Sequence, residues 1–556
     1  MLTELSDSTT ASPAITSLGW DMTYATTFVQ LNRVLAASGT LPQTFSGASS
    51  APASAAVSGE WASWTVVGGG PSNRLCLNCV VAHGQLTTAA GQSDINGSVW
   101  TVQFGLVLAK GATSTGGGTV WQLTTSATGP EAPILTGHAN VQVSGSDLYV
   151  LEQLMAEAIV PQVLALDLSG IAITTGDTTS ASDQPWLVPT AAAFACESLP
   201  PGDARGGIIG LLAMTEGRSA AGKQVVIDAR VLDGAPDGAS AAWFLGPTLM
   251  TSQLLAPAIQ GLVQGSQAAN FSVDGTGTTV YNNSDMTWGA FTYDESDGTT
   301  VTVTPRIPKG NIQLSLNGSL VHLSMSNINF PYPGWAGPGE ITVAFNAEQF
   351  IGFQFIQRTD GGLVMVPDTQ TFGSSSNITI IPDQTVLEFQ IALNAVTQVL
   401  MAFVGGAIES VGEAAGAAMQ EGAEGAYNAE FDLIEMEELG NSVNANVEQT
   451  EEDAATQAGD ALANEGNAGY VQRFKNAVIA NRWKILSKVV QKMVTIPVGK
   501  VSDIALWAAE KDYDKLPTLQ PFVSNAVTAV HWADGATFTP VGGSVQGGML
   551  IWGKLT

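Results

Sequence analysis

The residues best suited to chemistry in this sequence are its three cysteines and four histidines. Cys76 and Cys79 have the C-x-x-C spacing used by zinc sites and redox motifs, but no second pair follows at the distance that a zinc site needs. The four histidines are far apart, and none has a second ligand at metal spacing: His83, His138, His322 and His531. We therefore predict core or half-exposed thiols, structural histidines, no metal and no cofactor.

Catalytic motifs are equally absent from the sequence. The glycine runs Gly68–Gly70 and Gly116–Gly118 lack the Lys-Ser/Thr of a phosphate loop, so they predict turns. No Gly-x-Ser-x-Gly elbow has an assignable histidine and acid, and the acidic residues crowd into one segment without the aromatic pocket of a glycosidase pair. The sequence gives no reason to expect an enzyme.

Cations and apolar residues alternate at helical spacing between Tyr470 and Lys500. This pattern is typical of a helix that binds a membrane surface or a partner protein. The alternative is that the apolar residues face the core while the cations stay in water or pair with an acidic helix. The candidate contact residues in this segment are Arg473, Lys475, Arg482, Trp483, Lys484, Lys488 and Lys492.

The loop Pro331–Trp335 is a second candidate contact surface. Its prolines and glycine form a rigid frame that can expose Tyr332 and Trp335 to a membrane or a protein. The alternative is a buried tryptophan that closes the end of a sheet.

Length and charge restrict the class of protein. The chain has 556 residues, enough for several domains, and its 20 basic and 49 acidic residues give a formal net charge of −29. Such a charge repels nucleic acid and, at long range, anionic membranes. The N-terminus has no secretory signal pattern, and three cysteines fit a reducing compartment. We expect a soluble protein made in the bacterial cytoplasm, with any release by another route.

A membrane span is not expected, although membrane contact is left open. The longest apolar run, Ile391–Ile408, is interrupted by Asn394, Thr397 and Gln398 and stops at Glu409. It only approaches the length of about 20 residues that a spanning helix needs. We interpret it as a helix half buried in protein.

The first half predicts an antiparallel sheet with a few helices. Helical spacing predicts helices over Phe28–Ser38, Asp147–Val160 with Pro161 as a stop or kink, and Leu249–Gln264, the second one laid along the sheet as a core helix. A Gly/Ala/Ser loop is expected at residues 47–60. The expected strands are Trp61–Val67, Arg74–Val81, Trp100–Leu108, Thr119–Thr125, Gly207–Met214 and Gln224–Leu232.

The second half repeats this pattern and then changes. The expected strands are Thr299–Pro305, Asn311–Asn317, Leu320–Ile328 and Glu340–Phe345, and an Ala- and Glu-rich helical arm covers residues 386–510. The arm is acidic and then basic, which suggests neighbouring helices that pair, or else two separate solvated faces. The predicted organisation is a flexible leader at 1–14, a module at 15–265 and a second module at 266–556 that contains the arm.

The segment from Leu18 to Tyr24, followed by Asn32, resembles the opening of the OrfX-type and forty-seven-kilodalton accessory proteins encoded beside clostridial neurotoxins and insecticidal toxins. The residues that carry the motif are Gly19, Trp20, Asp21, Tyr24 and Asn32. The strand bounded by Gly68–Gly70 and His83-Gly84 agrees with that family, as does the C-terminal pattern from His531 to Gly553. The acidic segment Gly405–Gly469 departs from it.

The resemblance implies an α+β, mostly antiparallel β protein of the tubular lipid-binding (TULIP) superfamily, in which a curved sheet wraps a long helix around an apolar groove. The implied function is a toxin-associated accessory protein that binds lipid, another apolar ligand or toxin-cluster proteins through this groove. Two alternatives remain: a directly acting insecticidal or pore-forming protein that uses the helical segment, and a structural module that assembles with sister proteins.

Overall fold

The structure, a computed structural model, describes residues 14–50, 54–70, 74–114, 116–143, 145–177, 184–263, 265–294, 300–331, 341–382, 513–515, 518–532 and 535–556. The chain forms two compact units. The first unit contains Ala14–Gly246, Gln520–Ser544 and Gly548–Thr556, and the second contains Pro247–Leu519 and Val545–Gly547. The predicted arm at 386–510 and residues 1–13 of the predicted leader lie outside the described residues.

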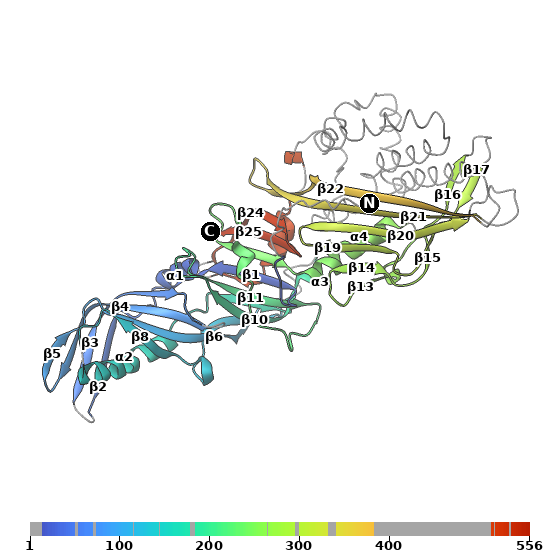
Figure 1. The fold of residues 1–556 in the computed structure, drawn as a ribbon. Coiled ribbons are helices and arrows are strands. Elements are labelled where there is room, and N and C mark those ends of the chain that lie inside the picture. The colour runs from blue at the N-terminus through green and yellow to red at the C-terminus, as the bar shows by residue number, and fades with distance from the viewer. Residues whose placement is uncertain are drawn as a thin grey trace. The chain divides into compact units, whose positions relative to one another are not determined.

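One sheet of the first unit joins strands from both ends of the chain (Figure 1). Its order is β10-β11-β1-β12-β25-β24. The strands are β1 Met22–Thr27, β10 Pro189–Ser198, β11 Gly207–Thr215, β12 Ala241–Leu245, β24 Phe538–Val545 and β25 Met549–Leu555. Its central strands are buried on both faces, which explains why β11 has the nearly continuous apolar sequence GIIGLLAMT.

Each face of this sheet packs against a different part of the first unit. Trp20, Phe244 and Trp552 belong to a buried apolar cluster on one face. On the other face, Trp243 packs edge-on against Phe522 of helix α11 (Gln520–Val527), with ring centroids 5.4 Å apart. The sheet is therefore the middle layer of a two-sided core.

A second sheet of the first unit has the order β2-β3-β4-β6-β7-β9-β23, with β5 paired to β4 and β8 to β6. Its strands are β2 Thr44–Ser49, β3 Ala55–Val67, β4 Arg74–Thr88, β5 Gly91–Asp94, β6 Val99–Thr113, β7 Thr119–Thr125, β8 Ile134–Ala139, β9 Ala172–Thr175 and β23 Val530–His531. The register shifts within β3 and within β6. Bulges of this kind bend strands, which accounts for the curl of this sheet into a half-barrel.

Two helices accompany this curled sheet. Helix α1 (Phe28–Ala37) begins after Thr27, whose side chain accepts the backbone N–H of Gln30. Helix α2 (Ser146–Leu164) packs against β2, β3 and β8. Gly47 of β2 permits this approach, because a Cβ atom there would lie 2.9 Å from the carbonyl oxygen of Leu154. Both helices confirm the sequence prediction. Helix α2 does not stop at Pro161, however, but continues to Leu164.

The second unit opens with a helix and continues as an antiparallel sheet. The helix runs through α3 (Pro247–Met250), a π-helical stretch (Thr251–Leu255) and α4 (Ala256–Leu262). The sheet has the order β13-β14-β19-β20-β18-β15, and β21 pairs with β20 and β22. Its strands are β13 Phe271–Val273, β14 Thr279–Asn282, β15 Met286–Thr287, β18 Arg306–Ile307, β19 Ile312–Asn317, β20 Leu320–Pro331, β21 Ile341–Gln357 and β22 Leu363–Pro382.

Several short elements complete the described chain. A hairpin pairs β16 (Phe291–Asp294) with β17 (Thr300–Val303) in the second unit. The short 3₁₀ helices are Gly129–Glu131, Pro185–Leu187, Ala229–Leu232, Ala268–Asn270 and Tyr513–Lys515. Within the described ranges, no helix combines the length and hydropathy that crossing a bilayer requires.

Two of the predictions for individual elements are wrong. The predicted loop at 47–60 is largely strand: β2 occupies residues 47–49 and β3 occupies residues 55–60, where small residues alternate between more and less exposed positions on the two paired strands. The predicted strand Gln224–Leu232 is instead a loop that ends in a 3₁₀ helix. Asp228 caps that helix by accepting the N–H of Arg230, a local bond that competes with strand pairing.

Candidate functional site

The family-motif residues at the start of β1 form a tight corner. Leu18 and Gly19 both have positive φ angles, of 52° and 87°. A Cβ atom on Gly19 would lie 2.8 Å from Nζ of Lys223, so the position combines a left-handed backbone with close packing. Glycine therefore serves the turn that brings the chain into the sheet.

Trp20 anchors this corner to the core. Its side chain is buried in the apolar cluster of the sheet, and its indole Nε1–H donates to the carbonyl oxygen of Gln224 at 2.8 Å. A buried indole normally finds such an acceptor. Trp20 thus fixes the loop before β1 against the loop after β11.

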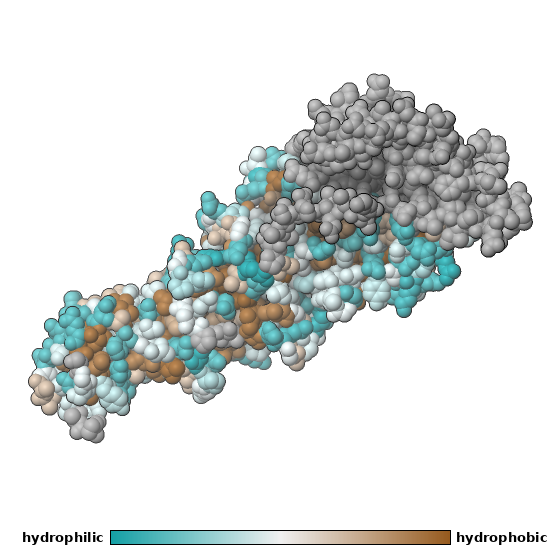
Figure 2. Space-filling view, viewed as in Figure 1, coloured by the Kyte–Doolittle hydropathy of each residue, from teal (hydrophilic) through white to brown (hydrophobic). Residues whose placement is uncertain are grey.

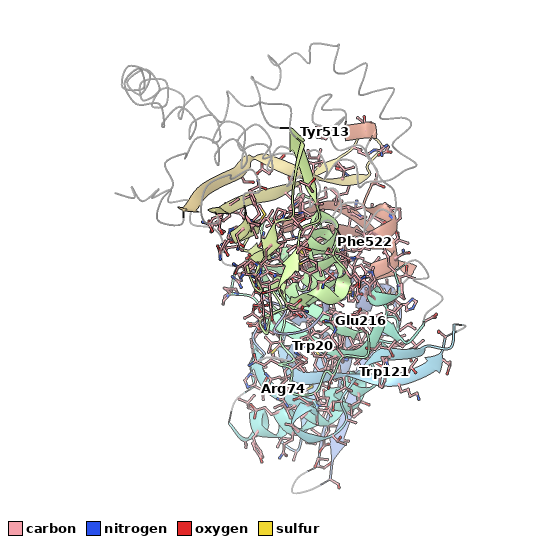
Figure 3. All side chains as sticks on the ribbon, turned by 90° about the vertical axis from the view of Figure 1, so that its right-hand side faces the viewer. Trp20, Arg74, Trp121, Glu216, Tyr513 and Phe522 are labelled. Atoms are coloured by element: carbon pink, nitrogen blue, oxygen red, sulfur yellow. The ribbon has the colours of Figure 1, made fainter. Side chains whose placement is uncertain are left out.

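Asp21 links the same two segments, which the labels of Trp20 and Glu216 mark in Figure 3, through its carboxylate. Its Oδ2 atom accepts the Thr215 backbone N–H at 2.7 Å and the Thr215 hydroxyl at 3.2 Å, and lies 3.2 Å from a guanidinium nitrogen of Arg218. Arg218 also pairs with Glu216 at 3.0 Å. Burial raises the pKa of Asp21, and the hydrogen bonds from Thr215 and the charge of Arg218 only partly oppose this.

Tyr24 and Asn32 act at two other places. The buried Tyr24 hydroxyl donates to the carbonyl oxygen of Ala526 at 2.7 Å, and so holds β1 to α11. The Asn32 side chain donates to the carbonyl oxygen of Val66 at 2.9 Å and accepts its N–H at 2.7 Å. Strand β2 pairs with Ala55–Glu60 of β3 and does not reach Val66. The Asn32 side chain therefore makes the two backbone hydrogen bonds that a neighbouring strand would make there.

The motif residues therefore do not gather into one reactive site. Gly19, Trp20 and Asp21 share a corner, whereas Tyr24 and Asn32 fasten separate elements to the core. The polar side chains among them are all engaged in hydrogen bonds inside the protein. These residues stabilise the fold by joining its elements through hydrogen bonds.

The inner face of the curled sheet beside α2 contains an aromatic cluster that sequence analysis missed. Phe45 packs 4.4 Å from Trp61, whose ring meets Trp64 edge-on at 5.6 Å. Residues three apart in a regular strand point to opposite faces, yet Trp61 and Trp64 are both buried because the register shifts between Trp61 and Ser63. The sequence carries no local signal for this cluster, because the register shift depends on the pairing of β3 with β4.

The two tryptophans differ in their hydrogen bonding. Nε1–H of Trp61 donates to Oε1 of Gln162 on α2 at 3.0 Å, and Nε2 of Gln162 donates to the carbonyl oxygen of Thr44 on β2 at 2.9 Å. Nε1 of Trp64, which is only 5% exposed, has no hydrogen-bond acceptor among the described residues. A buried polar group of this kind is uncommon, since the great majority are paired.

A polar contact also joins α2 to β8. Nε2 of His138 lies 3.0 Å from Oε1 of Glu152, and the His138 ring packs 5.5 Å from the buried Trp100. Trp100 donates its own N–H to the hydroxyl of Ser98 at 2.9 Å. This contact positions the helix along the inner face of the sheet, next to the aromatic cluster.

The cysteines and histidines singled out in the sequence have no metal-binding geometry. Cys76 and Cys79 are free, buried thiols of β4, and burial raises the pKa of both, which favours the thiol over the nucleophilic thiolate. Of the two predicted settings, core or half-exposed, the structure shows the core. In the part of the chain that the structure describes, no three His, Cys, Asp or Glu side chains gather as a metal site.

Two further histidines have structural surroundings. His531 lies 3.2 Å from the Thr174 hydroxyl in the first unit. In the second unit, His322 stacks on Phe350 at 4.2 Å, and burial lowers its pKa despite the nearby Glu348.

The candidate contact residues of the sequence lie outside the described residues, and their role stays a prediction. They comprise the two loop aromatics and the basic segment: Tyr332, Trp335, Arg473, Lys475, Arg482, Trp483, Lys484, Lys488 and Lys492.

Comparison with known proteins links this architecture to one family. The family model OrfX-like, described as Protein OrfX2/OrfX3/P47, matches residues 17–326, more than half of the chain. The crystal structure of P47 of Clostridium botulinum E1 is similar, with a TM-score of 0.50 and 16% identity over 69% of this chain and 87% of that one. P47 from Clostridium botulinum A2 has a TM-score of 0.48 and 15% identity over 71% and 88%. No curated protein sequence matches.

Proposed function

The chain belongs to the OrfX-like family, and from this membership we propose that it is a non-enzymatic accessory protein that holds a lipid or similar apolar ligand between α2 and the curled sheet. Membership associates the protein with bacterial toxin gene clusters and confirms the family that the motif around Trp20 predicted. The ligand and the tubular lipid-binding architecture implied by the resemblance are part of the proposal.

The arrangement of α2 supports this proposal. The helix has 19 residues and turns an apolar side toward the inner face of a sheet that curls around it. That inner face is apolar and aromatic, with Trp100 and Phe104 buried on β6 beside the Trp61 and Trp64 cluster of β3. Acyl chains favour surroundings of this composition, because burial of apolar surface is worth about 25 cal/mol per Å².

The observation that carries the proposal is the indole N–H of Trp64. Leaving a buried donor without an acceptor costs about 1–3 kcal/mol, so an acceptor on a bound molecule would stabilise the complex. A carboxyl, ester or phosphate oxygen of a bound lipid would accept this hydrogen bond while its chain met the aromatic rings. Trp61 is unsuited to the same role because Gln162 already accepts its N–H.

Native mass spectrometry of mildly purified protein, followed by organic extraction and lipid analysis, tests the proposal. We expect a stoichiometric lipid or fatty acid that remains with the protein under native conditions and is released by solvent. Protein that is reproducibly empty, and that does not take up added fatty acid or phospholipid, would contradict it.

A further inference from the structure

The outward side of α2 carries an apolar stripe. Tyr149 is 63% exposed and Leu164 is 36% exposed, while Ala156 and Val160 between them are half-buried. These residues follow helical spacing on the side opposite the buried Leu151 and Met155. In Figure 2, hydrophobic surface is visible on the part of the first unit where Figure 1 places α2.

This stripe is unusual for a surface helix. An ordinary helix on a sheet is apolar toward the core and charged toward water, whereas the outward side of α2 carries apolar residues as well as polar ones. The exposed polar side chains along the stripe are Gln153 and Glu157. Gln153 donates to the Tyr149 hydroxyl at 3.0 Å, which holds the tyrosine along the helix surface and so lowers the entropy that contact with a partner would cost.

The charge around the stripe is negative. Between Arg33 and Arg205, the sequence contains only two cations, Arg74 and Lys110. Arg74 is engaged with Glu131 and Gln103. Helix α2 and the strands that pack on it, β2, β3 and β8, contain no lysine or arginine, while α2 itself carries Asp147, Glu152 and Glu157.

We infer that the outward face of α2 docks a cationic amphipathic segment of a partner protein, whose apolar side covers Tyr149 and Leu164 while its lysines or arginines meet Glu157. The stripe from 149 to 164 is about 22 Å long at 1.5 Å per residue, the length of four turns of a partner helix. Exposed tyrosines flanked by complementary charge are typical centres of such contacts. This inference goes beyond the proposed function, since it uses the opposite side of α2 and requires no bound lipid.

The charge also argues against two other occupants. A second copy would bring two cation-free acidic faces together across a symmetric interface, where like charges repel. An anionic membrane would be repelled in the same way, and helices that lie on membranes usually carry lysine or arginine beside their apolar side.

Fluorescence anisotropy with two labelled synthetic helical peptides provides the test. One peptide combines leucine and lysine, and the matched peptide replaces each lysine with glutamate. We expect the full-length protein to bind the cationic peptide and not the anionic one, and Tyr149→Ser and Glu157→Lys each to weaken binding roughly five-fold, the loss typical of an interface residue worth about 1 kcal/mol.

Two control variants separate this site from general attraction to an acidic protein. Ile134→Ser removes a 46% exposed apolar residue from β8; Ile134 pairs with Gln103 and therefore lies on the other face of the sheet. Asp94→Lys makes the same charge change as Glu157→Lys at an exposed position on β5. Both controls should leave the affinity for the cationic peptide within about two-fold of the wild type.

Three results would overturn the inference. The first is equal weakening by the α2 variants and their controls, or no binding of the cationic peptide. The second is binding to phosphatidylcholine and phosphatidylserine vesicles that Tyr149→Ser abolishes, in the absence of peptide binding. The third is a concentration-dependent dimer in sedimentation that Tyr149→Ser dissociates. Bound lipid in native mass spectra should be the same in Tyr149→Ser and wild type, so this test fails independently of the proposed function.

Discussion

The corner that contains Trp20 and the surroundings of α2 differ in how one buried tryptophan in each is hydrogen-bonded. At the motif corner, Trp20 and Asp21 are buried, and each donates or accepts hydrogen bonds within the protein. Around α2, the buried N–H of Trp64 has no acceptor within the described ranges, and the outward Tyr149 is 63% exposed. The comparison indicates that Trp20 and Asp21 hold the fold, whereas Trp64 and Tyr149 are the residues on which the two proposals rest. The motif around Trp20 therefore has a structural role, and the proposed ligand contacts lie elsewhere, around α2.

The largest expected effect is at the motif corner. Trp20→Ala removes a buried ring from the apolar cluster together with its bond to Gln224, so the free energy of unfolding should fall by about 3–5 kcal/mol. Trp121→Ala is a control from β7, where the ring is only half-buried, and should cost clearly less. Urea unfolding followed by circular dichroism measures both variants. Equal losses in the free energy of unfolding would contradict a special contribution of Trp20 to stability.

Asn32 should have the next largest effect. Asn32→Ala leaves the N–H and the carbonyl oxygen of Val66 without their partner, which should cost roughly 1–2 kcal/mol because the site is only partly buried. Arg33→Ala changes an exposed neighbour on the same helix and should stay within about 0.5 kcal/mol of wild type. The same unfolding measurement checks both variants. Equal losses in the free energy of unfolding would contradict a stabilising role for the hydrogen bonds between Asn32 and Val66.

The pH dependence of stability should differ in sign between two buried aspartates. The pKa of Asp21 is raised by burial, so its ionised form costs stability above the folded-state pKa, and stability is gained as pH falls through that value. The pKa of Asp228 is lowered: although burial raises it, the hydrogen bonds from Arg230 and Thr16 outweigh that effect. Its stabilising contribution is present at neutral pH and is lost as pH falls.

Unfolding of Asp21→Asn and Asp228→Asn at pH 7 and near pH 4 tests this contrast. The stability of wild type relative to Asp21→Asn should rise on acidification, whereas its stability relative to Asp228→Asn should fall. If acidification changed both relative stabilities in the same direction, the pKa values of Asp21 and Asp228 would not be shifted in opposite directions.

The smallest stability effect is expected on the outward face of α2. Tyr149→Ser replaces a side chain that is 63% exposed and should change the free energy of unfolding by no more than about 0.5 kcal/mol. A loss of several kcal/mol would mean that Tyr149 belongs to the core, and the contrast between the two regions would disappear.

Much of the local structure of this protein could be predicted from its sequence. Alternating side chains located β7 at Thr119–Thr125 with the bounds that the structure has, and helical spacing located α1 and α2. These signals are strong because one face of each element is buried, which imposes a period on the apolar residues.

The remaining features depend on tertiary contacts that have no local signal. Trp64 shares a face with Trp61 only because of a bulge in β3, and a bulge is a response to the pairing with β4. Strand β25 pairs with β12 across about three hundred residues, from Trp243 to Ile551, and nothing in either segment specifies the other. The loop prediction for residues 47–60 failed because small residues can pair as strands when their neighbours supply the packing.

The occupancy of bound lipid in native mass spectra of Trp64→Phe tests the central claim most directly. Trp243→Phe is the matched control, since Nε1 of Trp243 is also buried without an acceptor among the described residues but lies against Phe522, at the sheet that contains β1. We predict that Trp64→Phe stays folded and loses most of its lipid, while Trp243→Phe keeps the wild-type occupancy. Equal occupancy in wild type and both variants would contradict a ligand held at Trp64.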